Sequence, residues 1–85
     1  MKDSQFPSVA VYDNGGKTID RYTAVFINEL ENRPWLFAAL AMNSEPFHPQ
    51  GFGQHCTAMR SRQLGKRIDS TKLSEDCQQF IRQNL

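Results

Sequence analysis

The chain has few cysteines and no long hydrophobic run, and each of these absences excludes a class of protein. Its two cysteines, Cys56 and Cys77, lie far apart in a chain of 85 residues and form no CxxC pair. Small secreted domains that are held together by disulfides need a denser framework of cysteines. We therefore expect two reduced thiols in a cytoplasmic protein, although the sequence also permits one disulfide between them.

The longest apolar run is WLFAALAM at residues 35–42, far shorter than the roughly 20 residues that a membrane-spanning helix requires. The first residues, MKDSQFPSV, contain one lysine and a proline at position 7, and they lack the apolar segment of a secretory signal. These features predict a soluble protein without membrane contact.

Size and composition indicate a single globular domain over residues 1–85. The net charge is +1, hydrophobic residues make up 39% of the chain and charged residues 22%, which are ordinary values for a folded domain. A chain this short buries only about 60–65% of its unfolded surface, so its core must be small. No sequence feature indicates a cofactor.

The first third of the chain predicts a β-hairpin. Two β-prone runs, at residues 9–13 and 20–28, flank the sequence NGG at residues 14–16. Asn-Gly favours the mirror-image turns of hairpins, because these turns need positive φ angles. We expect a hairpin over residues 9–28, preceded by a loose terminus at residues 1–7.

For the middle of the chain, the sequence indicates the secondary structure less clearly. Alanines and leucines at residues 35–42 suit a helix, whereas the short length suits a buried strand, and we favour a third antiparallel strand. Residues 29–34, ELENRP, predict a polar turn. Residues 43–63 are rich in proline and glycine and predict a long loop, after which LGKRID at residues 64–69 suits a short fourth strand.

The C-terminal residues predict a helix over about residues 74–85. An apolar stripe at helical spacing is formed by Leu73, Cys77, Phe80 and Ile81. Ser74 is a suitable N-cap residue at the start of this segment. Together these elements predict an α+β fold, in which a small antiparallel sheet of three to four strands packs one face against the C-terminal helix.

The uncharged stretch PFHPQGFGQHC, Pro46–Cys56, is the first candidate site. Its prolines and glycines suit a rigid, Ω-like loop. In a binding role, directional hydrogen bonds would come from His48, Gln50, Gln54 and His55. In a structural role, the same imidazoles and amides would satisfy the backbone of their own loop.

A basic segment at residues 60–67 is the second candidate site. It contains Arg60, Arg62, Lys66 and Arg67, and no acidic residue occurs between positions 46 and 68. Clustered cations near the aromatic residues of the preceding loop suit a nucleic acid or another anionic partner. The alternative is a solvated sheet edge, where Lys and Arg discourage strand pairing.

Two further hypotheses use the histidines. His48 and His55 can in principle serve as acid and base in phosphodiester cleavage, because imidazole titrates near neutral pH. With Cys56 they also offer three zinc ligands, although a closed structural site needs a fourth and adjacent residues rarely reach one metal.

Three motifs, YDNGG…DRYT, PFHPQGFGQHC and LGKRID…LSEDCQQFIRQ, resemble a set of small bacterial proteins found among plasmid- and phage-associated genes. The resemblance spans roughly residues 11–85 and implies no known activity. We therefore expect a small, non-enzymatic cytoplasmic binding module that uses residues 46–56 and 60–67 to bind nucleic acid or a partner protein. A His-dependent enzyme and a metal-binding protein are the alternatives.

Overall fold

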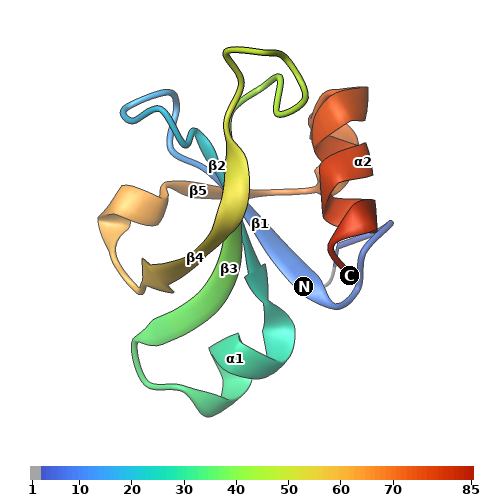
Figure 1. Ribbon diagram of the computed structural model, residues 1–85. Coiled ribbons are helices and arrows are strands. Elements are labelled where there is room, and N and C mark those ends of the chain that lie inside the picture. The colour runs from blue at the N-terminus through green and yellow to red at the C-terminus, as the bar shows by residue number, and fades with distance from the viewer. Residues whose placement is uncertain (1–2) are drawn as a thin grey trace.

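The computed structural model describes residues 3–85, apart from the side chain of Arg62. The elements are β1 (Val9–Asp13), β2 (Tyr22–Phe26), α1 (Ile27–Asn32), β3 (Leu36–Met42), β4 (Gly53–Met59), the 3-10 turn η1 (Arg62–Leu64), β5 (Lys66–Ile68), the 3-10 turn η2 (Ser70–Lys72) and α2 (Glu75–Gln83). The strands form one antiparallel sheet in the order β4-β3-β2-β1-β5 (Figure 1). The predicted α+β class is confirmed, but the sheet has five strands rather than three to four.

The predicted hairpin is confirmed. β1 and β2 pair in register from Val9 opposite Phe26 to Asp13 opposite Tyr22. In the connection, Gly15 has a φ of 78°, a conformation that residues with a Cβ rarely adopt. The side chain of Asn14 accepts hydrogen bonds from the backbone N–H groups of the next residues and closes the turn. Local chemistry therefore accounts for this hairpin. Its connection, residues 14–21, is longer than the two-residue mirror-image turn that Asn-Gly favours, and among the described residues only glycines have a positive φ.

The third strand is also confirmed. β3 lies between β2 and β4, and its last four residues, 39–42, are all buried because a core lies on each face of the sheet there. The preceding polar turn, in contrast, is the short helix α1. Its N-cap residue Phe26 makes no side-chain cap, so the usual sequence signal for a helix start is missing. α1 is instead tied to the sheet by Glu29, whose Oε1 accepts a hydrogen bond from Ala38 N at 3.0 Å.

The expected long loop over residues 43–63 is wrong in its second half, which contains β4. The sequence GQHCTAM has one β-branched residue and no alternating pattern that would indicate a strand. It becomes a strand because it pairs along its whole length with β3, from Leu36 opposite Met59 to Met42 opposite Gly53. The loop that remains covers residues 43–52.

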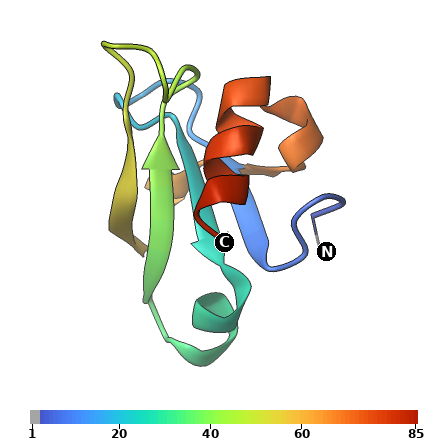
Figure 2. The same cartoon turned by 45° about the vertical axis from the view of Figure 1, so that its right-hand side comes forward.

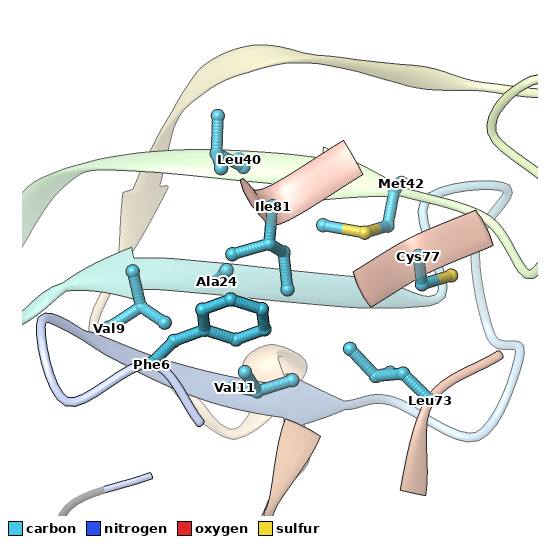
Figure 3. Packing of buried hydrophobic residues seen from close by; sticks show 9 residues of the cluster. All are labelled: Phe6, Val9, Val11, Ala24, Leu40, Met42, Leu73, Cys77 and Ile81. Carbon is cyan, nitrogen blue, oxygen red and sulfur yellow. The ribbon is translucent and has the colours of Figure 1, made fainter. Parts of the chain in front are cut away.

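The main core lies between one face of the sheet and α2, which packs across that face (Figure 2). Its side chains come from β1, β2, β3 and α2, and from the segments just before β1 and α2: Phe6, Val9, Val11, Ala24, Leu40, Met42, Leu73, Cys77 and Ile81 (Figure 3). The predicted C-terminal helix is confirmed, with Ser74 Oγ accepting the N–H of Cys77 at 3.3 Å. Both cysteines are free thiols.

The expectation of a loose terminus at residues 1–7 is wrong for residues 3–7, while residues 1–2 lie outside the described part of the chain. Phe6 belongs to the main core, and the Asp3 carboxylate is buried. Asp3 Oδ1 accepts a hydrogen bond from Ser70 Oγ at 2.6 Å, across almost the whole length of the sequence. A polar segment without a periodic pattern gave no sign of this long-range contact.

The opposite face of the sheet carries a smaller core. Val25, Phe37, Ala39 and Ala58 are buried there, with Leu30 of α1 and Leu64 of η1 packed against them. The sheet is strongly coiled, so that β4 crosses in front of β5 in Figure 1. Within residues 3–85, no helix has both the length and the apolar character that crossing a membrane requires.

Candidate nucleic-acid interface

The first candidate site, residues 46–56, is divided between a loop and β4. In the loop, His48 Nδ1 accepts a hydrogen bond from Gln50 N at 3.1 Å. The backbone closes on itself as well, because His48 N donates to Glu45 O and Gly51 N donates to His48 O. The side chain of His48 is thus used to hold its own loop, as the structural interpretation expects.

His55 and Gln54 belong to β4 and point to opposite faces of the sheet. His55 lies on the face that α2 covers, where its Nε2 is 3.0 Å from Asn84 Oδ1. Gln54 is exposed on the other face. His48 and His55 therefore bond different partners, one in the loop and one at the end of α2.

The hypothesis of a metal site is not supported, because successive residues of β4 point to opposite faces of the sheet. Cys56 follows His55 in β4, so its thiol lies on the opposite face, where burial raises its pKa. Among residues 3–85, the structure gathers no three His, Cys, Asp or Glu side chains that would hold a metal ion. His48, His55 and Cys56 thus do not form the proposed ligand set.

Arg60, at the end of β4, is held by the protein itself. Its guanidinium lies 5.0 Å from the centre of the Phe37 ring. Nε donates to Pro34 O at 3.3 Å and Nη2 donates to Leu30 O at 3.4 Å. Arg60 thus ties the last turn of α1 to β4. The side chain of Arg62, another predicted contact, lies outside the described part of the structure.

The other two predicted cations, Lys66 and Arg67, lie on β5 and line a surface hollow with a volume of about 560 Å³. We call it the cationic hollow, and its lining residues are Asp13, Arg21, Tyr22, Lys66, Arg67, Ile68, Asp69 and Lys72. Arg21 and Lys72 were not predicted as site residues. They come from β2's start and from η2, and no spacing in the sequence indicates that they join β5.

The two carboxylates of the cationic hollow are already bonded within the protein. Asp13 accepts hydrogen bonds from Arg21 Nε at 3.0 Å and from Arg21 Nη2 at 3.3 Å. This hydrogen-bonded guanidinium lowers the pKa of Asp13. Asp69 accepts hydrogen bonds from the backbone N–H and the hydroxyl of both Thr71 and Ser4. Both carboxylates are therefore hydrogen-bonded within the protein.

The balance of charge in the cationic hollow is positive. Its four cations and two carboxylates give 4 − 2 = +2 among the lining residues. Lys66 and Lys72 are exposed, and the Arg21 guanidinium lies 5.2 Å from the centre of the Tyr22 ring. An anion that enters the hollow meets two exposed ammonium groups, together with the partly buried side chains of Tyr22 and Ile68.

The rim of the cationic hollow is expected to make folding sensitive to acid through Asp69. Hydrogen bonds, first from Thr71 N and then from Ser4, hold the pKa of Asp69 well below its usual range. Because the folded pKa is lower than the unfolded pKa of about 3.9, the carboxylate stabilises the fold fully above that pH. The contribution is lost as pH falls from there through the folded pKa.

We expect the difference in unfolding free energy between the wild type and Asp69→Asn to narrow as the pH is lowered from about 6 to about 2.5. Urea titrations monitored by circular dichroism measure this difference. A difference that stays constant over the range would show that the Asp69 carboxylate is not stabilised by these hydrogen bonds.

Comparisons with protein-family models, with curated protein sequences and with solved structures find no match to this chain. The function is therefore argued from the geometry of the described residues.

Proposed function

We propose that the protein is a small, non-enzymatic binding module that contacts the phosphates of a nucleic acid through the cationic hollow. The observation that supports this proposal is the meeting of four cations from three separate segments, Arg21, Lys66 with Arg67, and Lys72, around one hollow. The two carboxylates beside them are hydrogen-bonded to Arg21 and to Ser4, and with both carboxylates counted the lining still carries a charge of +2.

The proposal moves the binding surface away from the histidine loop. His48 and His55 bond protein groups, and Arg60 is bonded to carbonyls of α1 and its following link. Since phosphate contacts carry no base information, we expect binding that depends little on sequence and strongly on salt. Neither phosphodiester cleavage nor metal binding is proposed, because no observation favours a shared role for the two imidazoles.

Replacing both exposed lysines of the hollow, Lys66→Gln with Lys72→Gln, is expected to weaken binding to a mixed-sequence oligonucleotide by roughly tenfold at low salt. The slope of log K against log salt should become shallower by about 2, since each lysine would release about one counterion. Fluorescence anisotropy at several salt concentrations measures both quantities. The charge removed lies away from the core, so the fold should be retained.

The matched control is Arg33→Gln, which removes a cation outside the hollow. Arg33 is exposed and pairs only with Glu29 on the same short helical segment, at 3.3 Å, among the contacts described. Its loss should change the affinity and the salt slope much less than loss of the two lysines. An effect of Arg33→Gln about half as large as that of the double variant would show that binding follows net charge alone, because the control removes one charge and the double variant two. Unchanged binding of the double variant would exclude the hollow as the interface.

A further inference from the structure

The two edges of the sheet differ in how they are protected. β5 forms one edge with only three residues, two of which are Lys66 and Arg67. A short, charged edge is the usual protection against pairing with another chain. β4 forms the other edge with seven residues, Gly53–Met59, which include no charged residue and no proline. This edge lacks the protection that β5 has.

The outer side of β4 presents regular strand groups. Arg60 N donates to Trp35 O at 2.8 Å, and Asn43 N donates to Phe52 O at 2.9 Å, in the same register as the β3–β4 pairing. In an antiparallel ladder, such pairs alternate with residues whose N–H and C=O point away. The outward residues of β4 are therefore Gly53, His55, Thr57 and Met59, and all four are exposed.

We propose that β4 is a self-association surface, at which two copies of this chain pair antiparallel across a twofold axis at Cys56. Centred there, the register opposes Gly53 with the second copy's Met59 and His55 with its Thr57, so all seven residues of each strand are paired. Registers centred on His55 or Thr57 leave residues at the strand ends unpaired. This proposal is independent of the proposed function, because the cationic hollow lies at the β5 end of the sheet.

The side chains of one end of β4 complement those of the other end. Met59 is 53% exposed and lies opposite Leu36, which is 47% exposed, on the face that carries α2. At the other end, Gly53 lies against the Phe80 ring, since a Cβ on it would be 2.9 Å from Phe80 Cε1. Phe80 in turn contacts the exposed Phe47, with ring centres 6.3 Å apart.

In the proposed register, each Met59 lies beside the Gly53 of the second copy and reaches its Phe80 and Phe47. Because of the twofold symmetry, this contact between apolar side chains occurs twice, once at each end of the interface. Because β4 has no charge, the pairing also brings no like charges together. These two features favour a second copy of the chain as the occupant of this edge.

The register makes a testable prediction about Cys56. As the central residue it faces its own copy in a pair without direct hydrogen bonds, where Cα atoms are about 4.5 Å apart, a distance that a disulfide can bridge. Diamide, which takes two electrons and two protons from two thiols, should convert the protein at about pH 9 into a dimer linked through Cys56. Cys56→Ser should abolish this link while leaving the noncovalent dimer in place.

The proposal is tested by sedimentation of the full chain over micromolar to millimolar concentrations. We expect a dimer for the wild type and for Thr57→Val, and a monomer for Thr57→Pro, because proline removes one outward N–H while sparing the bonds to β3. Met59→Lys leaves the backbone intact and should weaken association at least tenfold, which keeps the test valid if Thr57→Pro fails to fold. A wild type that stays monomeric throughout, or unchanged association of Met59→Lys, would overturn the proposal.

Discussion

Gly65→Ala is expected to lower the free energy of unfolding by about 4 kcal/mol, from backbone strain of roughly 1–3 kcal/mol and overpacking of similar size. Gly65 connects η1 to β5 with a φ of 90°. A Cβ at this position would lie 2.2 Å from Asp13 O and 2.5 Å from Asn14 Cα. These are backbone atoms at the end of β1, so they cannot move aside as a flexible side chain would.

Gly15→Ala is the matched control for this substitution. Gly15 also has a positive φ, 78°, but no heavy atom lies within 4 Å of the position that its Cβ would take. Only the conformational cost remains, about 1 kcal/mol. Urea titrations of both variants measure the difference. If both variants lose the same unfolding free energy, β5 does not approach β1 as closely as the structure has it. Lys66 and Arg67, which lie on β5, would then not line the cationic hollow.

Asp3→Ala is expected to lower the free energy of unfolding by about 3 kcal/mol, because buried donors that lose a charged partner cost roughly 1–3 kcal/mol each. The Asp3 carboxylate is 6% exposed and accepts four hydrogen bonds. Two come from the N–H groups of Gln5 and Phe6, and two from the N–H and hydroxyl of Ser70. Ser70 is fully buried, so water does not replace the lost acceptor.

Two further variants test whether the loss of stability comes from this hydrogen-bond network or from any change near the N-terminus. Asp3→Asn keeps the shape and one carbonyl oxygen, and its loss of stability should be intermediate. Gln5→Ala removes a side chain whose contact with Gln78 is exposed, and it should change the unfolding free energy by less than about 0.5 kcal/mol. A result within about 1 kcal/mol of the wild type for Asp3→Ala would contradict the buried network.

Several elements follow from the sequence alone, because their causes lie within a few residues. The hairpin needs positive φ angles that Gly15 and Gly16 supply beside Asn14. α2 has an N-cap, Ser74, and an apolar stripe at helical spacing. β3 is apolar throughout, as expected for a central strand. In each case local propensity and pattern agree with the final structure.

Other elements depend on contacts between segments that are distant in sequence. β4 has little strand propensity of its own and is a strand because β3 lies beside it. Asp3 and Phe6 are ordered by Ser70 and by the core beneath α2. The expected loop was therefore too long and the expected sheet too small, since neither pairing nor burial by distant segments leaves a local pattern.

The candidate site divides in the same way. The sequence by itself determined that cations gather after residue 59, and it named Lys66 and Arg67 among them. Only the tertiary structure decided which cations act together. Arg60 donates hydrogen bonds to carbonyls in and after α1, while Arg21 and Lys72 lie with β5 around the cationic hollow. Charge is a property of each residue, but an electrostatic surface is set by which residues the fold places side by side.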